Sequence, residues 1–121
     1  GLDNEGLEDI AAFADSMELV HIERTQVDDR GLAYLKPLKK MTLLQGRLLP
    51  IDGSGLEHLT EIDTLKTLEL SETGVNDAGL EHIGKMKNLE RLELWLTKVT
   101  DAGLPKLANC KKLKLLDIRQ T

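Results

Sequence analysis

Three histidines and one cysteine are the side chains of this sequence best suited to bind a metal or transfer a proton: His21, His58, His82 and Cys110. His58 follows Glu57 and His82 follows Glu81. The two pairs take the same place in a repeated unit, so we expect them on neighbouring helices. Packed helix axes lie about 8–10 Å apart, which is a long distance for both imidazoles to share one metal. We therefore expect the two Glu-His pairs to lie on a solvated outer face.

No other residues assemble a catalytic group. His21 is isolated from serine and cysteine partners. Cys110 takes a position that we expect in the core, where a free thiol behaves as a small apolar side chain. The glycines recur at the period of the repeat, so we interpret them as structural rather than as a phosphate-binding loop. The sequence therefore predicts a chain that is not an enzyme and has no catalytic residue, metal ligand or cofactor.

A phrase of the form L-x-x-L-x-L begins five segments at a fixed spacing of 24 residues. Positions four and six alternate as in a strand, so we expect positions one, four and six to point inward. An Asp-x-Gly-Leu phrase follows in three segments, and the Asp or the residue before it (Asp28, Asn76, Thr100) suits a helix N-cap. Each repeat is predicted to be a short strand, a turn and a short helix. The segments, numbered here from their first residues, begin at Met17, Met41, Leu65, Leu89 and Leu113.

This pattern predicts an α/β solenoid with parallel strands on its concave face and short helices on its convex face. We expect one domain over residues 1–121. Residues 1–16 are expected to form a half-repeat that caps the N-terminal end, with Ile10 and Phe13 pointing inward. The repeat that begins at Leu113 is truncated after its strand. Because this would leave an apolar edge, we expect further repeats or a partner to cover the C-terminal edge.

Composition and charge restrict the partners. The chain is 40% hydrophobic but only 2% aromatic, so its core must be aliphatic. The net charge is −5, and residues 1–29 carry nine acidic side chains against Arg24 alone, which makes nucleic acid an unexpected ligand. No apolar run reaches the length that crosses a bilayer, so no membrane partner is expected. One cysteine cannot form an internal disulfide, which fits a cytosolic protein and also a secreted solenoid.

The phrase L-x-x-L-x-L-x-x-T-x-V-T-D-x-G-L resembles the 24-residue leucine-rich repeats of large bacterial multi-repeat proteins. It is also similar to the cysteine-containing subfamily found beside F-boxes in ubiquitin-ligase substrate receptors. That subfamily has cysteine where this chain has Thr25, Thr73 and Thr97, and its second cysteine is matched once, by Cys110. No F-box-like segment is present, so the threonines favour the bacterial kind. The resemblance covers essentially the whole chain and implies a protein-binding scaffold.

A partner would meet the concave face, where the side chains of positions three, five and seven point outward. Trp95 is the aromatic residue at these positions, and Trp and Arg dominate binding hot spots. Leu96 and Arg119 are expected beside Trp95, which either anchors a partner or forms a stacked Trp–Arg cation–π pair that only covers the sheet. The predicted protein-binding surface comprises Trp95, Leu96, Arg119, Arg91, Glu93, Glu69, Asp117, Arg47, Leu43 and Leu48.

Three acidic residues at position five are expected to form a ladder on this face: Glu69, Glu93 and Asp117. Neighbouring strands lie about 4.8 Å apart, and like charges directly opposite are destabilising. Arg91 and Arg119 lie diagonally and could neutralise them. The ladder is either a self-satisfied salt-bridge network or a site for a cationic ligand.

The second repeat departs from the pattern. Gly46 replaces the core residue of position six, Leu49 replaces threonine, and Gly53 replaces aspartate. A hole left open at Gly46 would cost about 2–5 kcal/mol. We expect a distorted strand there, with a bulge that turns Leu48 or Leu49 inward. A local irregularity without function and a notch in the binding face both fit this pattern.

Two functions from different classes fit the sequence. The first is a non-catalytic recognition module that binds a protein or peptide through its concave face, which Trp95 favours. The second is a structural spacer or scaffold within a larger multidomain protein, which the uncovered C-terminal edge favours. An enzyme-associated domain is a third, weaker hypothesis.

Overall fold

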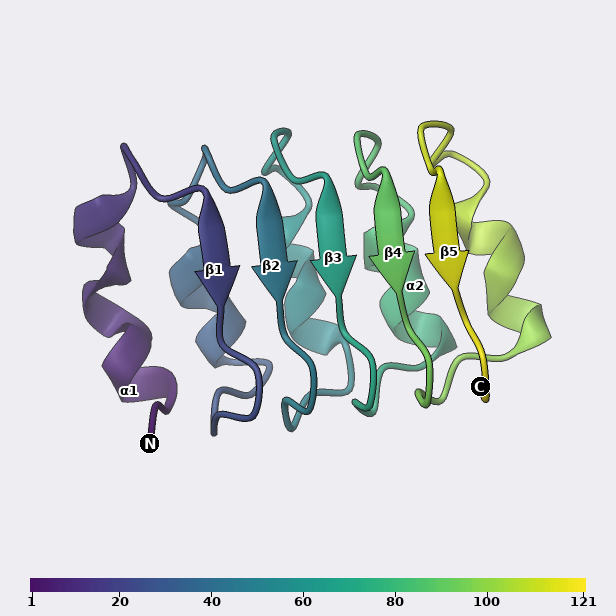
Figure 1. Ribbon diagram of the computed structural model, residues 1–121, viewed down its shortest axis with the longest axis horizontal. Coiled ribbons are helices and arrows are strands. Elements are labelled where there is room, and N and C mark those ends of the chain that lie inside the picture. Colours follow the sequence, from purple (N-terminus) through teal and green to yellow (C-terminus); the bar gives the residue numbers. More distant parts are fainter.

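Five strands of three residues each form one parallel sheet in the computed structural model, which describes all 121 residues (Figure 1). The strands follow one another across the sheet in sequence order, so no strand crosses over another. Leu19 pairs with Leu43 and Thr67 with Arg91, so each step repeats the 24-residue spacing. The strands are β1 (Leu19–His21), β2 (Leu43–Gln45), β3 (Thr67–Glu69), β4 (Arg91–Glu93) and β5 (Leu115–Asp117).

Short helices carry the chain from each strand to the next on the other side of the sheet (Figure 1). The predicted solenoid of parallel strands and short helices is therefore confirmed. None of the helices has the length and apolar character needed to cross a bilayer. They are the α-helices α1 (Asn4–Leu7) and α2 (Asp77–Ile83) and the 3-10 helices η1 (Glu8–Phe13), η2 (Gly31–Leu35), η3 (Ser54–Leu59) and η4 (Asp101–Leu107).

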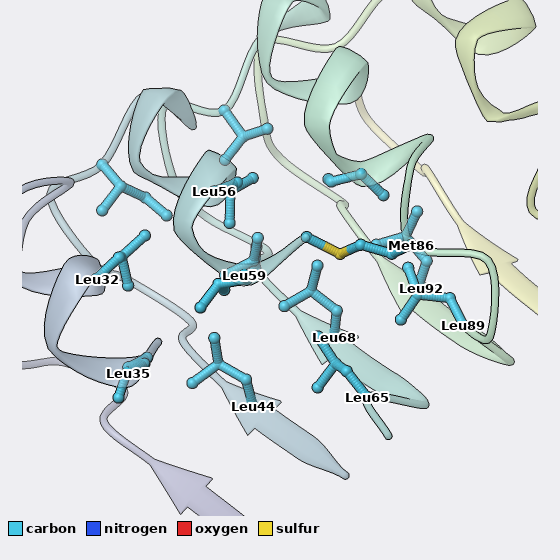
Figure 2. Packing of buried hydrophobic residues seen from close by; sticks show 14 of the residues in the cluster. Leu32, Leu35, Leu44, Leu56, Leu59, Leu65, Leu68, Met86, Leu89 and Leu92 are labelled. Carbon is cyan, nitrogen blue, oxygen red and sulfur yellow. The ribbon is translucent and has the colours of Figure 1, made fainter. Parts of the chain in front are cut away.

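A continuous hydrophobic core, rich in leucine, fills the space between strands and helices (Figure 2). Positions one and four supply Leu65, Leu68, Leu89 and Leu92 from the strand side, and all four are fully buried. Leucines of η2 and η3 belong to the same cluster on the helix side. Burying one leucine stabilises the fold by about 1.5–3 kcal/mol. Because each layer packs on the next, the repeats stabilise one another.

Side-chain caps start two of the helices as predicted. The Asn76 side chain accepts a hydrogen bond from the Gly79 N–H at the start of α2, at 3.1 Å. Thr100 accepts one from the Ala102 N–H at the start of η4, at 3.3 Å. These bonds satisfy donors that the first turn of a helix leaves free.

The aspartate of the Asp-x-Gly-Leu phrase has a second role that the sequence did not reveal. The Asp29 carboxylate accepts hydrogen bonds from the backbone N–H groups of Asp52, Gly53 and Gly55 in the next repeat, at 2.8–3.1 Å. A Cβ at Gly55 would lie 2.2 Å from the Asp29 carbonyl oxygen, so only glycine fits this approach. Asp77 accepts a bond from the Thr100 N–H at 2.8 Å in the same way. Asp29 and Asp77 thus each tie their own repeat to the next one.

The expected distortion of the second strand is wrong. β2 keeps the register of its neighbours, and Leu49 is buried and fills the space at Gly46. A Cβ at Gly46 would lie 2.9 Å from Leu49 Cδ1 and 3.0 Å from Leu70 Cδ2. Leu48 stays exposed with a left-handed φ of 63°. That conformation is no bulge, because the other residues at position eight share it: Arg24, Glu72, Leu96 and Gln120.

The inward position expected for Phe13 is also wrong. Its side chain is 55% exposed, whereas Ile10 is partly buried against the core. Phe13, Ile10, Leu7 and Met17 line a groove beside β1. No strand closes that groove, so the phenyl ring is left in solvent.

Candidate protein-binding surface

Trp95 lies on the strand side of the sheet, two residues after β4 ends, and is half-buried. The cation that stacks on it is Arg47, whose Cζ lies 4.9 Å from the centre of the indole. Both residues take position seven, two repeats apart. Ser71 takes that position between them, and its small side chain leaves the path of the arginine open. The Ser71 hydroxyl also accepts a hydrogen bond from the Trp95 N–H at 3.2 Å.

A second contact fixes Arg47 over the ring. Its Nε donates to Glu72 Oε1 at 2.6 Å, and its Nη2 contacts the same oxygen. Charge-assisted hydrogen bonds of this kind are about twice as strong as neutral ones. Arg47, Trp95 and Glu72 thus form an ordered unit that spans three repeats. The small residue at Ser71 was the available sequence signal for it.

The neighbouring arginine, Arg119, takes another partner. Its Nε and Nη2 donate to the two carboxylate oxygens of Asp117 at 2.9 and 2.8 Å. These bonds hold the pKa of the Asp117 carboxyl below its usual value and raise the pKa of the guanidinium. Arg91 Nε lies 3.8 Å from Glu93 Oε2. Arg91 and Arg119 therefore each pair along their own strand rather than diagonally.

Glu69 is the member of the acidic ladder without an arginine partner. It is only 8% exposed and accepts a hydrogen bond from the Ser71 N–H at 2.7 Å. Burial raises the pKa of the Glu69 carboxyl, and the neighbouring Glu93 carboxylate adds to that rise. Charge on Glu69 is therefore disfavoured, and a cation beside it would relieve the cost.

Two hollows lie on this face. One of about 490 Å³ is walled by Trp95, Arg119 and Gln120. The other, of about 220 Å³, crosses β1 to β4 and is lined by His21, Leu43, Gln45, Thr67, Glu69, Arg91 and Glu93. All ten residues of the predicted surface therefore lie on the strands or in the turns that follow them.

Leu48 and Leu96 provide apolar surface at the rim of this face. They are 37% and 44% exposed, and both sit in the left-handed turn of position eight. Leu96 directly follows Trp95, and Leu48 directly follows Arg47. The stacked pair is thus flanked by a leucine at each end.

Of the residues considered first for chemistry, His21 lines the second hollow, and the other three lie elsewhere. His58 and His82 line a hollow on the helix side, where His58 Nε2 is 3.7 Å from Glu57 Oε1 and His82 Nδ1 is buried without a hydrogen-bond partner. Cys110 is buried as expected, and its S–H donates to the Ile83 carbonyl at 3.4 Å. Burial raises the pKa of this thiol, which keeps it protonated and unreactive.

Among the solved structures that this chain resembles are two internalins from Listeria monocytogenes strain 4b F2365. Internalin inlF is 26% identical with a TM-score of 0.73, over 93% of this chain and 32% of that protein. Internalin C2 (inlC2) is 19% identical with a TM-score of 0.55, over 89% of this chain and 54% of that protein. The chain thus spans about a third of one neighbour and half of the other. No protein-family model and no curated protein matches it.

The class of protein follows from the parallel sheet, from the helices on its other side and from the similarity to these two internalins. The chain is a leucine-rich repeat solenoid, as its sequence resemblance implied. Folds of this class present an extended concave surface made of one outward row of side chains per repeat. The likeness to internalin inlF extends over 93% of this chain.

Proposed function

We propose that this domain is a non-catalytic recognition module, with repeats of the 24-residue bacterial type, that binds a protein or peptide through its concave face. The observation that carries the proposal is the ordered unit of Trp95, Arg47 and Glu72. Binding to side chains that are already ordered costs less conformational entropy. An indole fixed at the wall of a hollow is therefore an effective anchor for a partner.

Two further features indicate what kind of segment this face accepts. Leu48 and Leu96 offer apolar contact beside the ring, so an apolar side chain fits there. Glu69 and Glu93 line the second hollow, and Glu69 has no arginine partner, so a lysine or arginine fits there. An extended peptide that crosses the strands with one apolar and one basic side chain would use both hollows.

The test is the affinity of Trp95→Ala for a partner captured from the native source. The loss of a central aromatic anchor should weaken binding by about 2 kcal/mol or more, roughly 30-fold. Leu19→Ala is the matched control, because Leu19 also points outward from a strand but lies at the far end of the sheet. It should bind as the unchanged chain does.

Folding must be checked alongside binding. Trp95→Ala also removes the cation–π contact with Arg47, which at an exposed site contributes about 0.5–1 kcal/mol. Circular dichroism should therefore show a folded chain with slightly reduced stability. If the folded variant keeps full affinity, the domain does not bind through this unit. The structural spacer within a larger protein would then be the better account.

A further inference from the structure

Lysines are concentrated on one edge of the solenoid, where the chain turns from each helix into the next strand (upper edge in Figure 1). Four of these turns, residues 36–42, 60–66, 84–90 and 108–114, hold nine of the eleven lysines and only three acidic residues. Their net charge is +6, in a chain whose net charge is −5. We call these four turns the basic edge. Its lysines are Lys36, Lys39, Lys40, Lys66, Lys85, Lys87, Lys111, Lys112 and Lys114.

The lysine side chains of the basic edge are all exposed. Lys114 Nζ lies 3.6 Å from Glu90 Oε1, and the other eight ammonium groups form no ion pair within the chain. The turns 60–66 and 84–90 have a further turn of the basic edge on each side, so the exposure of their lysines does not come from an end of the chain. The first turn, residues 14–18, carries Asp15 and Glu18 instead and does not belong to the basic edge.

Side chains at position 24 of the repeat hold these turns in line. Thr64 Oγ1 donates to the Met41 carbonyl of the preceding turn at 2.7 Å. One repeat later, Asn88 Nδ2 donates to the Asp63 carbonyl at 2.9 Å, and Lys112 Nζ donates to Asn88 Oδ1 at 2.9 Å. Each turn is therefore joined to the one before it, and the lysines extend from an ordered row. Binding to an ordered surface costs less conformational entropy.

A hollow of about 650 Å³ lies in the middle of the basic edge, between the turns 60–66 and 84–90. Two of its carboxylates, those of Glu61 and Asp63, are exposed and are not used in an ion pair or hydrogen bond within the chain. Carboxylate oxygens accept hydrogen bonds from hydroxyl groups. The lining is polar throughout and consists of Thr60, Glu61, Asp63, Lys85, Lys87 and Asn88.

We propose that the basic edge binds a linear polysaccharide that carries sulfate or carboxylate groups. The polymer runs across the repeats along the row of turns. Its anionic groups lie against the lysines of residues 36–42, 84–90 and 108–114, and its hydroxyl groups donate to Glu61 and Asp63 in the hollow between them. This inference is separate from the proposed function, because Trp95 lies outside the basic edge.

The residue types of the basic edge favour this polymer over other anionic partners. Lysine supplies every cation, while the five arginines, which suit bidentate binding of phosphate, all lie elsewhere. The large exposed apolar and aromatic side chains of the chain also lie elsewhere. Nucleic-acid bases would have no ring to stack on, and a bilayer or a protein would have no apolar anchor. Glu61 and Asp63 would repel a polymer that carries a phosphate at every unit, but they suit sugar hydroxyls.

Titration calorimetry at low salt tests the proposal with two probes: heparin, which carries sulfate, and polygalacturonate, which carries carboxylate alone. At least one of them should bind, and added sodium chloride should weaken that binding because exposed charges are screened. Duplex DNA, a polyglutamate peptide and vesicles of phosphatidylserine are the comparison ligands. Each should bind more weakly than the polysaccharide when the affinities are compared at equal anionic charge.

Lysine substitutions locate the binding surface. The double variant Lys85→Ala/Lys87→Ala should weaken polysaccharide binding about fivefold or more, on the scale of two exposed ion pairs. Lys98→Ala is the matched control, because Lys98 is also an exposed lysine but lies in the turn from β4 to η4 on the opposite edge. It should bind as the unchanged chain does. All these side chains are exposed, so circular dichroism should show the same fold in each variant.

A second pair of variants tests the hydroxyl contact in the hollow. Asp63→Asn and Asp63→Ala remove the same charge, but only the amide of asparagine keeps an oxygen that accepts a hydrogen bond. Asp63→Asn should therefore bind the polysaccharide more tightly than Asp63→Ala. For a partner held by charge alone, the two variants would have equal affinities.

Four results would overturn the proposal. The first is that neither polysaccharide binds at low salt. The second is that DNA, polyglutamate or the vesicles bind as tightly at equal charge, which would assign the basic edge to that partner. The third is that Lys85→Ala/Lys87→Ala binds as Lys98→Ala does, which would mean that another surface holds the polymer. The fourth is equal affinity of the two Asp63 variants, which would show that no hydroxyl group is bound there.

Discussion

In the second repeat the small side chain stands at position six, as Gly46, and the large one at position nine, as Leu49. In other repeats position nine is threonine, and the Thr73 hydroxyl donates to the Leu70 carbonyl of position six at 2.7 Å. Leu49 gives up that hydrogen bond but occupies the volume that a position-six leucine would fill. The core thus keeps its packing density while the hydrogen bond is lost.

Gly46→Leu should therefore destabilise the chain by about 1–3 kcal/mol, because two leucines would compete for one space. Adding Leu49→Thr restores the pattern of the other repeats and should recover most of that loss. Urea unfolding of the single and double variants measures both effects. A single variant as stable as the unchanged chain would mean that the space at Gly46 is empty.

Glu69 links burial on the binding face to pH. Burial raises its pKa in the folded state, so the folded chain binds a proton at Glu69 more readily than the unfolded chain does. Folding stability from this group is therefore lost as the pH rises from the ordinary glutamate pKa through the raised one. At neutral pH the ionised carboxylate beside Glu93 is destabilising.

Glu69→Gln should accordingly stabilise the chain at pH 7, by about 0.2–1 kcal/mol on the scale of cross-strand pairs. The gain should shrink as the pH falls towards the ordinary glutamate pKa, where Glu69 itself becomes neutral. Thermal unfolding between pH 4 and pH 7 measures this. Glu57→Gln on the exposed helix side is the control and should show no such trend. An equal gain at every pH would contradict the assignment.

Between elements, the strands pair through backbone bonds, while the turns before the helices are joined by side chains. Asp29 connects the turn before η2 to the turn before η3 through three backbone N–H groups. Asn4 does the same one repeat earlier, since its Oδ1 accepts a bond from the Asp28 N–H at 3.0 Å. These side chains hold the helix edge of the solenoid at the spacing of the strand edge.

Asp29→Ala should cost about 2 kcal/mol, within the range for hydrogen bonds to a charged group, because three backbone donors lose their acceptor. Asp101→Ala is the matched control. Asp101 takes the same position in its repeat as Asp29, but no following turn donates hydrogen bonds to its carboxylate. Its effect should stay within about 0.5 kcal/mol. Chemical unfolding of both variants gives the comparison. Equal losses would show that the aspartate acts only within its own turn.

At the scale of the whole molecule, stability is close to a sum over repeats and the contacts between neighbours. β3 has a packed repeat on each side, whereas β5 has one on one side only. The exposure of Leu116 is the direct consequence. Local opening should therefore begin at the β5 end.

Hydrogen exchange in dilute solution should be faster in residues 113–121 than in residues 65–72. The reason is that opening β5 breaks contacts on one side, while opening β3 breaks them on both. Equal protection of the two segments in dilute solution would contradict this account.

The sequence by itself determined the repeat, the parallel order of the strands and which strand side chains face the core. These follow from local rules, because side chains alternate along a strand and each copy of the 24-residue unit stacks in register on the last. The outward placement of Trp95 came from the same alternation. The burial of Cys110 followed from its place in the repeat.

Only the tertiary structure decided what long side chains do across repeats. Arg47 reaches Trp95 because Ser71 between them is small, and Leu49 rather than Leu48 fills the space at Gly46. The Asp29 carboxylate, in the turn before η2, accepts hydrogen bonds from the corresponding turn of the next repeat. Each of these contacts depends on the free space and the unpaired donors of a neighbouring repeat. The residue pattern within one repeat carries no information about either.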